Sequence, residues 1–219
     1  LVSSIVSKGR QAMLTGILVY GDPESGSNVT NAQNISPKSG LRLDYLGVFK
    51  KDKLVGWLNR NDSKGVSYIT DHVKSTAVNI PCEGEQITVN TTSSKTKIKG
   101  KVKNGNPKID INVTSEGSIG EVECTIDLSK PEKIEELNKR YAKDIKDKIE
   151  GSIKTLQEKY QSDIFGFGEE IHRTDPKAWK RLEGNWDQEF ANLDVNVTVT
   201  AKIRNLGTIS DSFQKEIEE

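Results

Sequence analysis

The sequence predicts an α+β fold in which a mainly antiparallel β-sheet packs against one long and one shorter C-terminal helix. Short apolar segments, separated by Gly, Asn, Ser or Pro, fill residues 41–126 and indicate strands. A continuous apolar stripe at helical spacing then covers residues 131–160. Strict two-residue alternation returns at residues 195–204, which indicates a closing strand. This order of elements differs from the regular strand–helix alternation of parallel α/β folds.

Composition limits the classes of function. The 219 residues carry 32 Lys and Arg against 32 Asp and Glu, and this balance argues against a nucleic-acid binder, which needs a basic excess to neutralise phosphates. Hydrophobic residues make up 33% of the chain, so the core is lean. The longest apolar runs, such as residues 17–20, have about four residues, far below the roughly 20 that span a bilayer.

We expect two regions along the chain. Residues 1–45 are predicted to be the end of a preceding N-terminal region, made of a helix, a strand and a long loop at residues 21–40. Residues 46–219 are predicted to form the C-terminal α+β domain. Because Leu1 is not a start methionine, we expect the chain to begin inside a longer gene product.

The strands have recognisable turns between them. A hairpin is expected at residues 41–58, and Asn61, Asp62 and Ser63 are expected to cap a short helix that ends near Ile69. Five further strands are predicted at residues 75–81, 86–92, 95–102, 108–114 and 119–126.

The long helix has a clear start. Ser129 and Glu132 form a capping-box pattern, and Pro131 suits the first helical turn. Apolar residues then recur mostly every fourth position, which favours packing on a sheet; a coiled-coil partner is the alternative. The stripe consists of Ile134, Leu137, Tyr141, Ile145, Ile149, Ile153, Leu156 and Tyr160.

A second helical region begins at Asp175 and Pro176, which supply an N-cap and a first helical position. Its aromatic stripe is interpreted as core. The closing strand is expected to be half-buried and antiparallel, because apolar and polar residues alternate strictly. The aromatic stripe consists of Trp179, Leu182, Trp186 and Phe190.

Candidates for chemistry are few. Cys82 and Cys124 lack metal-ligand spacing and are interpreted as buried free thiols, although a single bridge stays open if the compartment is oxidising. Glu169 and His172 form one Glu-x-x-His pair, whereas a di-iron site needs two. No nucleophile elbow or phosphate loop is present. The sequence therefore predicts no catalytic residue, no cofactor and no metal.

Two segments are candidate interaction surfaces. One is a row of lysines that share one face of a strand, namely Lys95, Lys97, Lys99, Lys101 and Lys103. Two interpretations stay open: a patch for anionic lipid or an acidic partner, and a protected edge strand, which is favoured. The other is the loop Phe165, Gly166, Phe167 and Gly168, where we expect a buried ring and at least one glycine with positive φ.

Three motifs together resemble a known family. Residues 47–58 have the sequence GVFKKDKLVGWL, residues 163–168 have DIFGFG, and residues 195–207 form the closing strand. In this combination the chain resembles the C-subunit lipoproteins of bacterial spore nutrient germinant receptors, the Ger(x)C family. The resemblance extends over residues 14–213.

The resemblance implies a non-enzymatic receptor subunit. Members of the family carry a lipid on an N-terminal Cys and hold a soluble body at the outer face of the spore inner membrane. They act with integral-membrane subunits to detect nutrients such as amino acids or sugars. Whether this subunit senses germinant or acts as a scaffold stays open.

Two functions of other classes are the alternatives. A secreted hydrolase or transferase would need a titratable constellation that the chain lacks. An extracellular small-molecule-binding module for nutrients would need a deep pocket with convergent polar groups.

Overall fold

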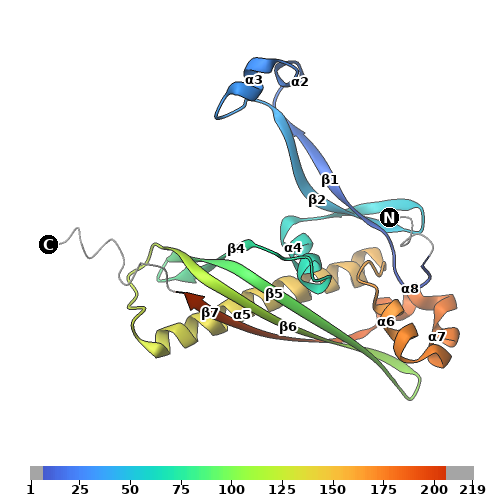
Figure 1. Cartoon of the computed structure of the whole chain (residues 1–219). Coiled ribbons are helices and arrows are strands. Elements are labelled where there is room, and N and C mark those ends of the chain that lie inside the picture. The colour runs from blue at the N-terminus through green and yellow to red at the C-terminus, as the bar shows by residue number, and fades with distance from the viewer. Residues whose placement is uncertain (1–6, 206–219) are drawn as a thin grey trace.

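A computed structural model describes residues 7–205 of the chain. Its strands form a three-stranded sheet in the order β1-β2-β3 and a four-stranded sheet in the order β4-β5-β6-β7. In Figure 1 the β1–β2 hairpin projects away from the body, α5 runs along the four-stranded sheet, and α6, α7 and α8 cluster at one end. The predicted α+β class, with its long and shorter C-terminal helices, is confirmed.

The small sheet forms the N-terminal part of the described chain. It consists of β1 (Met13–Tyr20), β2 (Gly40–Lys50) and β3 (Lys53–Leu58), so the expected hairpin is β2–β3. The expected loop between β1 and β2 contains two short helices, α2 (Pro23–Gly26) and α3 (Val29–Gln33), because Asp22 and Asn28 accept backbone N–H groups as N-caps.

The expected N-terminal helix is not found in the described part. Residues 7–12 form a turn and an irregular segment, and residues 1–6 lie outside the described residues. The boundary expected between residues 45 and 46 falls inside β2. The division into two regions stays a prediction.

The four-stranded sheet is built from longer strands than the sequence indicated. Its strands are β4 (Thr76–Cys82), β5 (Glu85–Lys103), β6 (Asn106–Val122) and β7 (Asp194–Asn205). Each of β5 and β6 combines two predicted strands, because register shifts interrupt the alternation of side chains without ending the ladder.

The direction of β7 corrects one prediction. β7 pairs with β6 in parallel, from Lys108 opposite Asp194 onward, and not antiparallel as expected. The long helix α5 carries the chain back along the sheet before β7 begins, so β7 runs in the same direction as β6 (Figure 1). The alternation of apolar residues reports a half-buried strand, but it carries no information about pairing direction.

Three helices begin close to where they were expected, namely Arg60–Ile69, Pro131–Thr155 and Pro176–Leu182, whereas the helix Phe167–Thr174 was not expected. α4 (Arg60–Ile69) is capped by Asn59, two residues before the expected cap. α5 (Pro131–Thr155) has Pro131 at its start, but the capping box is absent: Lys130 is the N-cap residue, and the Ser129 hydroxyl donates to Asp127 at 2.6 Å. The remaining elements are η1 (Leu156–Tyr160), α6 (Phe167–Thr174), α7 (Pro176–Leu182), η2 (Glu183–Asn185) and α8 (Trp186–Ala191).

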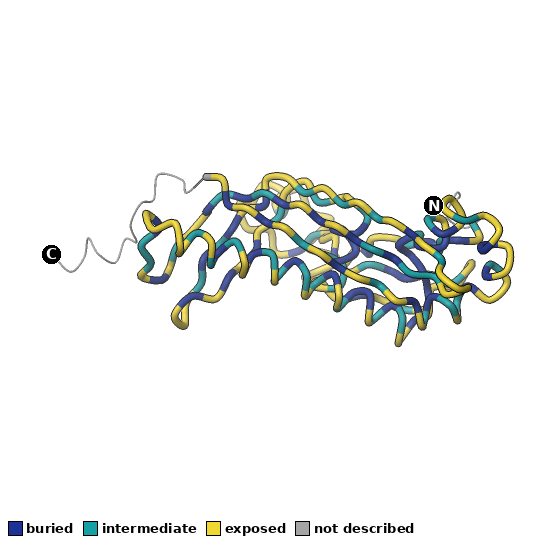
Figure 2. The backbone as a smooth tube through the Cα atoms, turned by 90° about the horizontal axis from the view of Figure 1, so that it is seen from below, coloured by how far each residue is buried: buried dark blue, intermediate teal, exposed yellow. Residues whose placement is uncertain are grey.

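The core lies between α5 and the four-stranded sheet. Every stripe residue from Leu137 to Tyr160 is buried, and the backbone N–H of Ile203 on β7 donates to Asn138 Oδ1 of α5 at 2.8 Å. Packing on a sheet is thus confirmed over a coiled coil. Figure 2 shows buried and exposed residues alternating along the strands, so one face of the sheet meets the helices.

Candidate functional site: the Asp163 loop, the lysine row and the disulfide

The loop at residues 163–168 connects η1 to α6. Gly166 has a φ of 85°, in the left-handed region, and stands at the N-cap position of α6. Phe165 and Phe167 are both buried, with ring centroids 4.8 Å apart, and both rings also lie against Phe190. The predicted buried ring and positive-φ glycine are confirmed.

Asp163 organises this loop. Its buried carboxylate accepts backbone N–H groups of Gly166 (2.9 Å), Phe167 (3.2 Å) and Gly168 (2.8 Å). The indole Nε1 of Trp186 donates to the same carboxylate at 3.0 Å. Burial raises the pKa of Asp163 to about 6, and the four N–H donors act in the opposite direction.

The role of Asp163 was not among the predictions. The sequence did contain one signal for this role: an aspartate stands shortly before the first residues of a helix, where free backbone N–H groups need an acceptor. The participation of Trp186 has no local signal, because it lies 23 residues further along the chain. All of the hydrogen bonds described for the Asp163 side chain hold the loop and α8 together.

The segment at residues 7–12 lies across this loop. The N–H of Gln11 donates to the carbonyl of Asp163 at 2.7 Å, and the N–H of Glu169 donates to the carbonyl of Gly9 at 3.1 Å. A Cβ atom added at Gly168 would stand 2.8 Å from the Cα of Gly9 and equally close to the ring of Trp179. Gly168 is therefore required by close backbone packing, whereas Gly166 is required by its φ.

The lysine row lies on the exposed face of β5. All five lysines are exposed. Lys95 pairs with Asp71 and Lys101 with Asp110, while the other three have no ion pair among the described residues. These three lysines are Lys97, Lys99 and Lys103.

The edge of β5 is protected by means other than the lysines. β4 pairs only with the first part of β5, up to Thr91. Beyond it, the N–H of Thr96 donates to Asp71 Oδ1 at 2.9 Å, and the N–H of Gly100 reaches Glu170 Oε1 at 3.4 Å. These side-chain oxygens accept backbone N–H groups at the edge of β5, which an added strand would need for its own pairing.

The structure does not bring the two candidate surfaces together. A Cβ atom added at Gly100 would lie 2.9 Å from Cδ1 of Ile171 on α6, so Gly100 faces the helices. Its neighbours Lys99 and Lys101 point to the opposite face of the strand. The lysine row and the Asp163 loop are therefore separate features.

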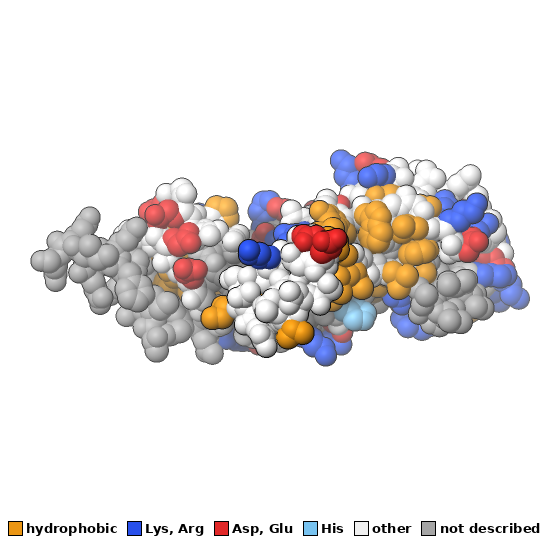
Figure 3. Space-filling view, turned by 90° about the horizontal axis from the view of Figure 1, so that it is seen from above, with side chains coloured by type: hydrophobic (Ala, Val, Ile, Leu, Met, Phe, Trp, Pro, Cys, Tyr) orange, Lys and Arg blue, Asp and Glu red, His pale blue; other side chains and the backbone are white. Residues whose placement is uncertain are grey.

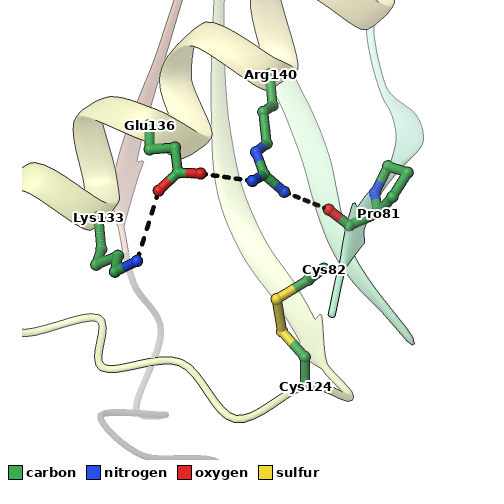
Figure 4. The surroundings of a disulfide bond; sticks show 6 residues. All are labelled: Pro81, Cys82, Cys124, Lys133, Glu136 and Arg140. Atoms are coloured by element: carbon green, nitrogen blue, oxygen red, sulfur yellow. Dashed lines mark hydrogen bonds and ion pairs between the residues drawn. A yellow bond between two sulfur atoms is a disulfide. The ribbon is translucent and has the colours of Figure 1, made fainter. Parts of the chain in front are cut away.

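Cys82 and Cys124 form a disulfide, which corrects the expectation of free thiols. Figure 4 shows the bond joining the end of β4 to the segment after β6, beside α5. Arg140 of α5 donates to the carbonyl of Pro81 at 2.7 Å and contacts Glu136, which is also paired with Lys133 at 3.6 Å. With both sulfurs in the bridge, neither can act as a nucleophile or metal ligand.

The two histidines contact an aromatic ring and a hydroxyl group, respectively. His172 is exposed and stacks on Trp179 with ring centroids 5.8 Å apart, and His72 contacts the hydroxyl of Thr70 at 2.9 Å. Within residues 7–205, no three His, Cys, Asp or Glu side chains gather as metal ligands do. None of the helices described in this range has the length and apolar content needed to cross a membrane.

The fold and these sites define an α+β module in which the buried Asp163 carboxylate and a surface strand of lysines are the distinctive features. The family model described as "Spore germination B3/ GerAC like, C-terminal" matches residues 44–207. The chain belongs to this family of spore germination proteins, which confirms the resemblance found in the sequence.

Individual relatives agree with this assignment. Spore germination protein KC of Bacillus subtilis (strain 168) is 26% identical over 100% of this chain and 54% of its own length. Spore germination protein YndF of the same strain is 27% identical over 95% of this chain and 51% of its own length. The crystal structure of the GerBC protein superposes with a TM-score of 0.69 at 25% identity, over 76% of this chain and 53% of that chain. The chain thus spans about half the length of the curated relatives it matches.

Proposed function

We propose that this chain acts as a non-enzymatic, extracytoplasmic part of a spore nutrient germinant receptor, together with integral-membrane receptor subunits. The observation that carries the proposal is the family match over residues 44–207. The family resemblance adds the finer expectation of a lipid anchor at the outer face of the spore inner membrane.

Two features of the chain support the finer parts of this proposal. The Cys82–Cys124 bridge suits an oxidising, extracytoplasmic compartment, because cytosolic reductants keep such pairs reduced. The buried carboxylate of Asp163, whose pKa is raised to about 6, is fully engaged by backbone and indole donors. It is therefore a structural group and is not free to act as a general base.

The lysine row is the better of the two candidate contact surfaces. Phe165 and Phe167 are buried, so their rings are not available to a partner. Lys97, Lys99 and Lys103 are exposed, lie on one face and have no ion pair among the described residues, which suits an acidic partner surface or anionic headgroups. The Asp163 loop then supports this contact surface indirectly, because it holds α6 against β5, the strand that carries the lysines.

The test is a germination assay on spores that carry charge reversals. We expect Lys97, Lys99 and Lys103 changed together to Glu to slow nutrient-triggered germination while the protein level in the spore stays normal. The matched control reverses Lys53, Lys177 and Lys180, which are likewise exposed and have no ion pair within residues 7–205. Normal germination in both strains would remove the lysine row from the proposed contact surface. A strain that lacks the whole gene and germinates normally on every nutrient would contradict the receptor role itself.

Nutrient binding by this module is the second candidate function. A polar cleft of about 610 Å³ lies between residues 7–11, the β2–β3 turn and α8, and both Lys50 and Asp187 line it. Opposite charges in one cleft suit a zwitterionic amino acid, although Lys50 and Asp187 are also 3.2 Å from each other. A thermal-shift screen with amino acids and sugars separates the two functions, since a ligand that binds the folded chain raises its Tm.

A further inference from the structure

The outer edge of β7 is open. Because the strand order is β4-β5-β6-β7, β7 has a neighbouring strand only on the side of β6 within residues 7–205. β7 is 12 residues long, and residues 195–201 within it include no Gly, no Pro and no charged side chain. The opposite edge of the sheet, along β5, is shielded by Asp71 and Glu170, whose carboxylates accept backbone N–H groups. An unshielded edge such as that of β7 is a template for pairing with another strand.

Hydrogen bonds at the two ends of β7 show which of its backbone groups face this edge. The N–H of Ile203 donates to Asn138 Oδ1 at 2.8 Å, and the register with β6 is continuous from Asp194 to Ile203. Peptide groups alternate in direction along a strand, so the N–H and C=O groups of the odd-numbered residues in 195–201 point to the same side. Just before the strand, Gln157 donates to the carbonyl of Leu193 at 2.9 Å. Between these two positions the outward groups have no side-chain hydrogen bond within the described chain.

The sequence of this segment is complementary to itself. In an antiparallel pair of β7 strands with a two-fold axis at Thr198, Val197 lies opposite Val199 of the second copy. In the same register Val195 lies opposite Ala201, and the two Thr198 side chains lie opposite each other. Pairs of β-branched residues and Thr–Thr pairs stabilise neighbouring strands. A two-fold interface requires self-complementarity of this kind.

Charges at the ends of the segment fit the same register. Asp194 lies opposite Lys202 of the second copy, and the symmetry produces this pair twice. Lys202 has no ion pair among the described residues. Asp194 contacts Lys108 of its own chain at 2.7 Å, and a carboxylate can accept further donors. Opposite charges directly across two antiparallel strands favour their pairing.

The hydrogen bond at Ile203 argues against the neighbouring register. The pairing centred at Thr198 uses only the outward backbone groups of residues 195–201. A pairing centred at Val199 would place Val195 opposite Ile203, whose N–H already donates to Asn138. The position of the axis at Thr198 therefore satisfies both the backbone groups and the charges.

Two valines of β7 are incompletely covered in the single chain. Val195 and Val199 are only half-buried, whereas Val197 and Ala201 on the same face of the strand are buried. A strand added at the open edge would cover more of the two half-buried side chains, and burial of apolar surface favours association.

The largest exposed apolar surface lies elsewhere. Among residues 7–205, the exposed large hydrophobic side chains lie between Leu14 and Trp57, in the small sheet and its hairpin. Figure 3 shows hydrophobic side chains gathered on the face seen from above. Association through that face would depend on apolar burial and not on β7, so substitutions on β7 distinguish the two modes.

We propose that two copies of this chain associate through their β7 strands, antiparallel about a two-fold axis at Thr198, and join their four-stranded sheets into one continuous sheet. Because this axis is perpendicular to the sheet, α5 of both copies lies on one face and both lysine rows lie on the other. The inference goes beyond the germinant-receptor role and does not depend on it.

Sedimentation equilibrium with charge substitutions tests the interface. We expect the 219-residue chain to form a dimer in a concentration-dependent way. Asp194→Lys and Lys202→Asp should each raise the Kd of the dimer about tenfold, because each places like charges opposite each other at two positions. The double substitution restores opposite charges and should return the Kd to that of the wild type, which also shows that neither change unfolds the chain. Lys97→Asp, on the exposed face of β5, is the control and should leave the Kd unchanged.

A cysteine at the two-fold axis gives an independent readout. Across a non-hydrogen-bonded antiparallel pair the two Cα atoms are about 4.5 Å apart, so Thr198→Cys should form a disulfide-linked dimer under mild oxidation. The native cysteines do not compete, because Cys82 and Cys124 are bonded to each other. Asn112→Cys is the matched control: it lies beside Thr198 on β6 and would stand three strand spacings, about 14 Å, from its counterpart. It should remain unlinked.

Three results would overturn the proposal. One is a chain that sediments as a monomer at every soluble concentration. Another is a dimer whose Kd the substitutions at Asp194 and Lys202 leave unchanged, because such a dimer uses another surface, such as the apolar face of the small sheet. The third is equal cross-linking of the Thr198→Cys and Asn112→Cys variants, because random collision would then account for both.

Discussion

The carboxylate of Asp163 and the indole of Trp186 are joined by a buried hydrogen bond of 3.0 Å. This contact connects the loop before α6 to the start of α8, two segments that only the tertiary fold brings together. It also fixes the position of Trp179, whose ring packs on Trp186 with centroids 5.1 Å apart. The hydrogen bond and the ring contact therefore connect α7, α8 and the loop before α6 at one end of the molecule.

The contribution of the indole N–H can be measured with two Trp→Phe substitutions. Trp186→Phe should lower the free energy of unfolding by about 1–2 kcal/mol more than Trp179→Phe does, because only Trp186 donates to a buried charge. Trp179 is similarly buried and serves as the volume-matched control. Equal losses in chemical denaturation would mean that the hydrogen bond contributes nothing beyond ring packing.

The pH dependence of stability follows from the pKa of Asp163. In the folded protein burial raises this pKa to about 6, above the ordinary value of 3.8. The folded state therefore binds a proton more tightly than the unfolded state does. The resulting stability is fully present below about pH 4 and is lost as the pH rises through about 6.

Asp163→Asn removes this titration. Between pH 4 and pH 7 the wild type should lose about 2–3 kcal/mol of unfolding free energy more than the Asn variant, because its carboxyl group releases a proton with a pKa of about 6 when folded and 3.8 when unfolded. Urea denaturation of both proteins across this range is the measurement. Parallel pH profiles would show that Asp163 titrates alike in the folded and unfolded states.

Because the backbone of Gly166 is left-handed, any side chain added at this position should lower the stability of the protein. Gly166→Ala should destabilise the protein by more than about 1 kcal/mol, because its φ is 85° and Arg10 Cδ stands 3.3 Å from the added Cβ. Gly184→Ala is the control, since no atom lies within 4 Å of the Cβ that it adds. A neutral Gly166→Ala substitution in thermal denaturation would contradict the described loop.

Alanine substitutions in the apolar stripe of α5 should destabilise the protein far more than those on the outer face of this helix. Ile145→Ala or Ile149→Ala should each cost about 2–5 kcal/mol, because both side chains are fully buried in the core. Lys146→Ala should be nearly neutral, since its contact with Glu150 is a surface ion pair. Chemical denaturation of the three variants is the measurement, and similar losses at both kinds of position would mean that the helix is rotated from the described register.

The disulfide should contribute several kcal/mol. Cys82 and Cys124 are 42 residues apart, and closing a loop of this length stabilises a fold by about 3–4 kcal/mol relative to the open chain. Treatment with dithiothreitol should therefore lower the Tm of the wild type. A variant with both cysteines changed to Ser should show the lower Tm from the outset and should not respond to the reductant.

How well each feature could be predicted from the sequence depended on how far apart in the chain its interacting residues lie. The stripe of α5 and the alternation of β7 were predicted correctly, because both periodicities are set by residues a few positions apart. The capping box at Ser129 failed because Asp127 competes for the hydroxyl of that serine. The interruptions predicted within β5 and β6 were wrong, because a register shift keeps the strand pairing while it changes the face of each side chain.

Local pattern and motif were enough to establish the α+β class, the register of the long helix, the glycine turn at residue 166 and the family. Three other features became visible only in the folded molecule: β7 runs parallel to β6, Cys82 meets Cys124, and Asp163 accepts the indole N–H of Trp186. Each of these joins segments that are distant in the chain. Their partners are fixed by how the helices pack on the sheet and not by the neighbours of each residue in the sequence.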